Sequence, residues 1–101
     1  MATASMTQAL PAPVVESIQA LAQRCGIKRV RLFGSRARGD NRERSDIDLA
    51  VSGGNVAEFS CDIDYETPTL LMFDVVDLDK PVNPELLKSI NRDGIDIYVG
   101  E

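Results

Sequence analysis

Apolar residues recur along this chain at two spacings, and each spacing predicts one kind of element. Intervals of three and four residues predict helices, whereas strict alternation predicts strands. Helical spacing covers residues 14–25, 55–66 and 84–93, with Pro13 and Gly26 near the two ends of the first helix. Alternation covers residues 28–33, 46–51 and 95–99. A continuous apolar run over 70–76 predicts a further strand, central in its sheet and covered on both faces.

A short polar stretch, 35–38, separates the first two strands and predicts a helical turn that opens at Ser35 as the N-cap and ends at Gly39. The expected order is therefore α-β-(short α)-β-α-β-α-β. This order predicts an α/β (α+β) fold in which a mixed four-stranded sheet is flanked by helices. At 101 residues we expect a single domain over 13–101, preceded by a flexible N-terminal lead over 1–12.

Two carboxylates share one face of the strand over 46–51. Alternation sends Ile47, Leu49 and Val51 into the core, so Asp46 and Asp48 project together from the other face, about 7 Å apart by strand rise. Such a pair repels unless a cation lies nearby, and magnesium favours a few carboxylates completed by water and phosphate. A solvent-exposed polar face would give the same alternation.

Asp74 and the Gly34-Ser35 turn each have two interpretations. Asp74 interrupts an apolar strand. In one interpretation its carboxylate completes a metal site or accepts a proton from an attacking hydroxyl. In the other it lies at a strand end and caps a neighbouring loop. A glycine and a serine between a strand and a helical turn offer N–H groups and a hydroxyl to a phosphate, or form a plain structural turn. The pattern of a P-loop or a dinucleotide-binding loop is absent from 34–39.

Charge and composition exclude several classes of function. The net charge of −5 combines 8 basic and 3 acidic residues over 1–44 with 3 basic and 13 acidic residues over 45–101. An acidic chain with one basic loop suits a small polyanion better than duplex DNA, so nucleic acid is not expected as a direct partner. The chain has no histidine and two distant cysteines, which exclude imidazole-based sites and zinc fingers. We expect a cytoplasmic protein without a membrane span.

Three short segments form a linked pattern. They are Gly34-Ser35-x-Ala37-Arg38-Gly39, then after five residues Ser45-Asp46-Ile47-Asp48-Leu49, and later Phe73-Asp74-Val75. This pattern resembles the minimal nucleotidyltransferase (MNT) family of the DNA polymerase beta superfamily, and the similarity extends from the first helix to the last strand.

The resemblance implies a reaction and roles for individual residues. It implies transfer of AMP from ATP to a hydroxyl group, with release of pyrophosphate and dependence on Mg²⁺, two ions being expected. Gly34, Ser35 and Arg38 would hold the triphosphate. Asp46, Asp48 and Asp74 would be the catalytic and metal-binding acids, with Asp74 also helping to activate the acceptor.

The resemblance also implies a partner, because members of this class are often paired with a HEPN-domain toxin. The leading hypothesis is an antitoxin of the type VII kind that adenylylates a tyrosine of that toxin. One alternative is a non-catalytic antitoxin that neutralises its partner by occlusion. Another is nucleotidylation of a small molecule of the aminoglycoside type. Whether the chain forms a homo- or hetero-oligomer is left open by the sequence.

Overall fold

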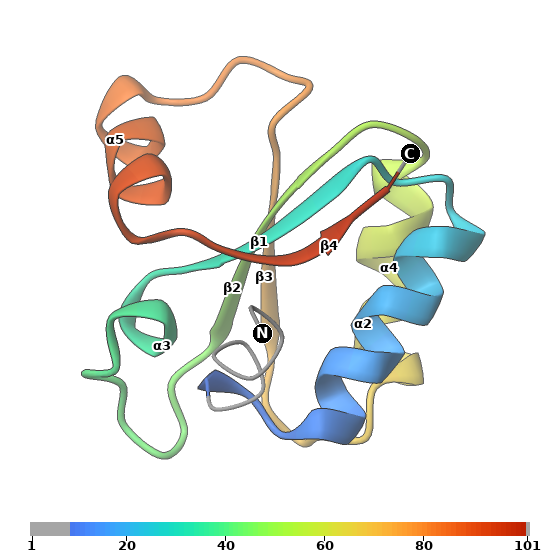
Figure 1. Cartoon of the computed structure of the whole chain (residues 1–101), viewed down its shortest axis with the longest axis horizontal. Helices are drawn as coiled ribbons and strands as arrows, with labels where there is room; N and C mark the ends of the chain where they lie inside the picture. The colour runs from blue at the N-terminus through green and yellow to red at the C-terminus, as the bar shows by residue number, and fades with distance from the viewer. Residues whose placement is uncertain (1–8, 101) are drawn as a thin grey trace.

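The computed structural model describes residues 9–100, which fold around one four-stranded sheet (Figure 1). The strands are β1 (Arg29–Phe33), β2 (Ile47–Ser52), β3 (Phe73–Asp77) and β4 (Ile95–Val99), and their order across the sheet is β3-β2-β1-β4. The pairs β1–β2 and β1–β4 are antiparallel, whereas β2 and β3 are parallel. The mixed four-stranded sheet predicted from the sequence is confirmed.

The longer helices lie on opposite faces of the sheet (Figure 1). Helices α2 (Ala12–Arg24) and α4 (Val56–Glu66) cover the face that holds the main core. Helix α5 (Pro84–Asp93) packs on the other face through Ile90, which contacts a small cluster with Phe33 and Ala50. The short helix α3 (Ser35–Arg38) follows β1 at one end of the sheet. Alternation along β2 therefore sends Leu49 toward α2 and α4 and leaves Asp48 on the same side as α5.

Local capping explains where the helices begin. The Asn55 side chain accepts a hydrogen bond from the Glu58 N–H at 3.1 Å, and the Asn83 side chain accepts one from the Glu85 N–H at 2.8 Å. Asn55 and Asn83 are the N-caps of α4 and α5, and the two helices begin close to the positions expected from the apolar spacing. Residues 1–8 of the predicted N-terminal lead lie outside the described residues. Leu10, at the end of that lead, is only 2% exposed and packs in the core.

The strand predicted over 70–76 was placed wrongly. β3 begins at Phe73 and lies at an edge of the sheet, so it is not a central strand covered on both faces. Pairing with β2 starts at Phe73, opposite Ile47, and residues 70–72 form a loop in which Leu70 is fully exposed. The apolar run therefore combines side chains exposed on a loop with partly buried side chains of an edge strand.

None of the helices within residues 9–100 has both the length and the apolar character that a membrane crossing requires.

Candidate active site

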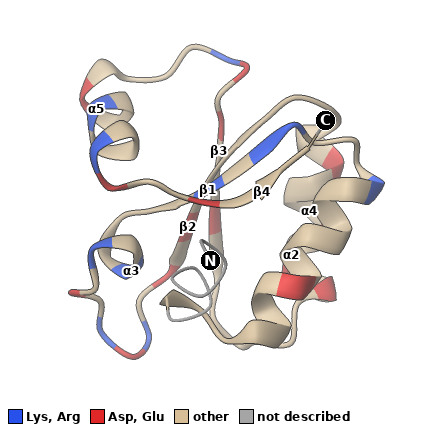
Figure 2. Ribbon diagram, viewed as in Figure 1, with Lys and Arg blue, Asp and Glu red and all other residues tan. Residues whose placement is uncertain are grey.

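Parallel pairing of β2 with β3 brings the predicted acids together. Asp48 lies directly opposite Asp74 in the register of the two strands, so both side chains project from the same face of the sheet. Asp46 is two residues before Asp48, just ahead of β2, and therefore lies on that face as well. Figure 2 shows the acidic positions on these neighbouring strands. Asp46 and Asp74 are exposed and Asp48 is half-buried, so the face is open to a ligand.

Gly34 connects this acidic face to helix α3. It follows Phe33, which pairs with Asp48, and it has the positive φ of 75° with ψ of −156° that is essentially restricted to glycine. A Cβ atom at this position would lie 2.3 Å from Oδ2 of Asp48. The close approach of the turn to the carboxylate therefore requires a residue without a side chain.

Ser35 is the first residue of α3, and the N-cap position belongs to Gly34. The prediction of Ser35 as the N-cap is wrong by one residue, because the positive φ of Gly34 makes the chain turn before the serine. The N–H groups of a first helical turn have no partners within their helix. At α3 these groups and Ser35 follow directly after Gly34, whose backbone approaches Asp48, and phosphate oxygens would be suitable acceptors for them.

The acidic face carries charge that its surroundings do not neutralise. The pKa of Asp48 is raised above its ordinary value, first by burial and then by the negative charges of Asp74 and Asp46. Arg38 and Arg36 oppose this effect without cancelling it. A cation bound between the carboxylates would relieve the repulsion, since a like charge disfavours ionisation and an opposite charge favours it.

The donor set fits magnesium in its chemistry. Three carboxylates supply hard oxygen ligands, and magnesium usually keeps several waters and binds substrate phosphates as well. Among residues 9–100, no group of three acidic or cysteine side chains converges closely enough to enclose an ion unaided. Water and nucleotide oxygens would therefore have to complete the coordination.

Arg38, predicted to hold the triphosphate, lies at the end of α3 and its side chain reaches α5. Its guanidinium forms ion pairs with Asp40 at 3.1 Å and with Asp93 of α5 at 3.3 Å, and these two carboxylates raise its pKa. Arg92 also pairs with Asp93 and is the main cause of the lowered pKa of that carboxyl group. The link between α3 and α5 through Asp93 was not predicted, because nothing in the spacing of the sequence relates these helices.

Arg36 has a structural contact that the sequence did not reveal. Its guanidinium donates to the backbone carbonyl of Ser45 at 2.8 and 3.0 Å and to that of Glu43 at 3.1 Å. These bonds fasten α3 to the loop that leads into Asp46. Arg36 therefore connects the Gly34-Ser35 turn to the carboxylate pair.

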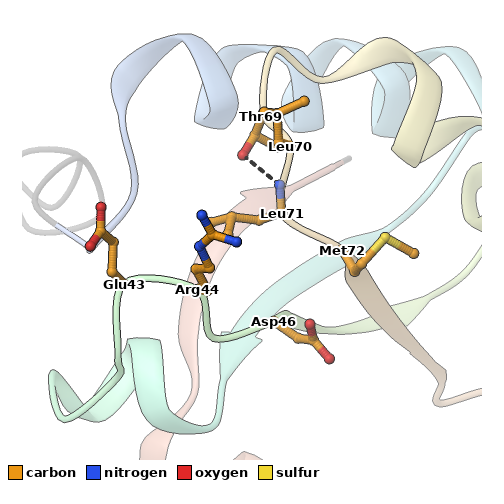
Figure 3. A pocket seen from close by; sticks show the side chains of 7 residues that line it. All are labelled: Glu43, Arg44, Asp46, Thr69, Leu70, Leu71 and Met72. Atoms are coloured by element: carbon orange, nitrogen blue, oxygen red, sulfur yellow. Dashed lines mark hydrogen bonds between the residues drawn. The ribbon is translucent and has the colours of Figure 1, made fainter.

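A pocket of about 510 Å³ lies beside Asp46 (Figure 3). It is formed by the loops that lead into β2 and β3, and its lining residues are Glu43, Arg44, Asp46, Thr69, Leu70, Leu71 and Met72. Four of the seven come from the segment 69–72, which the sequence had assigned in part to a strand. The pocket was therefore not predicted.

Comparison with known proteins assigns this chain to a family. The sequence pattern of the polymerase beta nucleotidyltransferase family matches residues 16–100, and the chain belongs to that family. A structure described as a candidate minimal nucleotidyltransferase is 31% identical, with a TM-score of 0.62 over 80% of this chain and 86% of that one. The resemblance to the minimal nucleotidyltransferases predicted from the signature is confirmed.

Two further relatives have names that describe their activity or assembly. A candidate protein adenylyltransferase of Methanocaldococcus jannaschii is 48% identical over 50 residues, which are 50% of this chain and 48% of that protein. The match thus spans about half the length of the curated relative. A chain of a toxin–antitoxin complex crystallised with AMP-PNP shares the fold, with a TM-score of 0.68 and 23% identity over 86% of this chain and 74% of that one.

Proposed function

We propose that this chain is a magnesium-dependent adenylyltransferase that moves AMP from ATP to a hydroxyl group of a partner protein. The observation that carries the proposal is the register of β2 and β3, which sets Asp48 opposite Asp74 beside the Gly34 turn. Family membership supports nucleotidyl transfer. The names of the M. jannaschii relative and of the toxin–antitoxin complex support a protein acceptor and a toxin partner.

Each of these residues has a role in an in-line displacement at the α-phosphorus. The first turn of α3, with Ser35, binds the β- and γ-phosphates, and Arg38 stabilises the leaving pyrophosphate. Asp46, Asp48 and Asp74 would hold the metal ions, which would neutralise charge on the triphosphate. Asp74 also accepts the proton of the attacking hydroxyl.

The covalent change is simple. A bond forms between the acceptor oxygen and the α-phosphorus as the bond from the α-phosphorus to the bridging oxygen of pyrophosphate breaks.

The test is transfer of label from α-labelled ATP, with magnesium, to the protein encoded by the neighbouring gene. Asp48→Asn should abolish transfer, because it removes a negative charge from the acidic face while keeping the shape of the side chain. The matched control is Glu16→Gln on the opposite side of the sheet, which likewise replaces a carboxylate by its amide, here an exposed one on α2. Transfer that persists in Asp48→Asn at the wild-type rate would refute the proposal.

The acceptor is proposed to be a tyrosine of a HEPN-domain toxin. Mass spectrometry of the labelled partner, before and after phosphodiesterase treatment, identifies the modified residue and the AMP group. If the wild type and Asp48→Asn both neutralise the toxin and no AMP is attached, occlusion is the operative activity. The adenylyltransferase proposal then fails.

A further inference from the structure

The pocket beside Asp46 lies where two strands enter the sheet together. Because β2 and β3 are parallel, the loops that precede them meet at the same end of the sheet. The Ile47 N–H donates to the Met72 carbonyl at 2.9 Å, which joins the two loops. The pocket between them is continuous with the acidic face, since Asp46 belongs to both.

The backbone of the loop over 67–72 is fixed by internal hydrogen bonds. Thr67 is buried and its hydroxyl donates to the Ile63 carbonyl at the end of α4. The Thr69 hydroxyl oxygen accepts from the Leu71 N–H at 3.1 Å, as Figure 3 shows. The Phe73 N–H donates to the Asp64 carboxylate at 3.3 Å. These hydrogen bonds fix the backbone of the loop, so its outward side chains have defined positions.

The side chains that this loop presents are apolar. Leu70 is fully exposed and Met72 is 61% exposed, and both line the pocket. Neighbouring exposed apolar residues next to a reaction site are typical of a protein-binding surface rather than of a solvated loop. Arg44 adds a positive charge to the same wall, and its side chain forms no ion pair with any residue between 9 and 100.

The position of the pocket relative to the Gly34 turn indicates which substrate it receives. Across the sheet the order is β3, β2 and β1, so the acids of β2 and β3 lie between the loop that precedes β3 and the Gly34 turn that follows β1. In an in-line displacement, the attacking and leaving oxygens are on opposite sides of the phosphorus. If pyrophosphate leaves toward the Gly34 turn, the acceptor hydroxyl approaches from the side of the pocket.

We propose that the pocket formed by Arg44, Leu70 and Met72 is the docking site for the acceptor protein. The segment that docks there carries the acceptor hydroxyl, places apolar side chains on Leu70 and Met72, and pairs an acidic side chain with Arg44. This inference rests on the proposed function, because the in-line argument needs a triphosphate at the Gly34 turn. It adds a specificity surface that lies outside the phosphate- and metal-binding residues.

The test measures KM separately for the acceptor and for ATP. The acceptor is the purified protein encoded by the neighbouring gene, and the variants are Leu70→Ser, Met72→Ser and Arg44→Glu. Each should raise the KM for the acceptor by about tenfold or more. A buried leucine or methionine is worth at least that factor, and Arg44→Glu would set a like charge against the acidic side chain of the acceptor. The KM for ATP should remain within about twofold of wild type, since these residues lie beyond the triphosphate.

Val99→Ser is the matched control, because it also replaces an exposed apolar side chain but lies on β4 at the opposite edge of the sheet. It should leave both KM values unchanged. A rise in the KM for ATP instead of the acceptor would mean that the pocket holds the nucleoside, and would overturn the proposal. Unchanged KM values in all three pocket variants would also overturn it.

A binding measurement distinguishes failure of this inference from failure of the proposed function. If the wild type binds the partner protein but transfers no AMP, the proposed function fails. The docking site is then judged by isothermal titration calorimetry. Weaker binding of Leu70→Ser than of Val99→Ser would support it, and equal binding would refute it. If the wild type neither binds nor modifies the partner, both proposals are refuted.

Discussion

Replacing Gly34 by alanine would place a methyl group against the carboxylate of Asp48. The added Cβ would lie 2.3 Å from Oδ2 and 3.2 Å from Cγ of that side chain. The Asp48 carboxylate can escape this contact by rotating, which displaces a proposed metal ligand from its position beside the Gly34 turn. We therefore expect Gly34→Ala to impair AMP transfer more severely than it impairs folding.

Two magnitudes follow from the structure. A non-glycine residue at φ of 75° and ψ of −156° costs about 1–3 kcal/mol of stability, which urea unfolding would measure. A displacement of the carboxylate by about 1 Å is expected to lower the rate of transfer about a hundredfold. Gly39→Ala is the control, because Gly39 also has a positive φ, of 86°, but a Cβ there would meet no atom within 4 Å.

A double-mutant cycle isolates the contact itself. In Asp48→Ala the two closest atoms are absent, so Gly34→Ala should cost less stability in that background than in the wild type. The reasoning would be refuted by an equal cost in both backgrounds. It would also be refuted if Gly39→Ala lowered transfer as much as Gly34→Ala does.

Three further predictions concern charge, positioning and packing. Since burial and neighbouring acids raise the pKa of Asp48 above 3.8, its contribution to the free energy of unfolding should decline as pH rises through that raised pKa. Asp48→Asn should remove this decline, as measured by urea unfolding at a series of acidic pH values, and an unchanged decline would show that another group causes it. Arg36→Ala should lower AMP transfer about tenfold with an unchanged circular dichroism spectrum, because the loop before Asp46 loses its anchor at Ser45. Arg36→Lys should restore only part of the rate, since an ammonium lacks the planar fork, and full restoration would mean that charge alone matters. Phe59→Ala should lower the free energy of unfolding by about 3–5 kcal/mol in urea, because the Phe59 side chain on α4 is fully buried, and a loss below about 1 kcal/mol would show that the core refills the space.

The elements were predictable where local interactions specify them. Asn55 and Asn83 accept from N–H groups two or three residues later, so the start of each helix depends on neighbouring residues alone. The alternation over 95–99 matches β4 residue for residue, because the strand buries Ile97 and turns its neighbours outward. The run over 70–76 misled because apolar composition does not distinguish a buried strand from an exposed loop.

The order of the elements, the outward face shared by Asp46 and Asp48, and the family signature could be read from the sequence alone. These follow from side-chain alternation and from motifs that span a few residues. Three features depend on the fold: Asp74 lies opposite Asp48, Arg38 reaches Asp93, and the loops before β2 and β3 form a pocket. Strand register and loop contacts join residues distant in the chain. Their pairing depends on how the whole core packs, which no local pattern specifies.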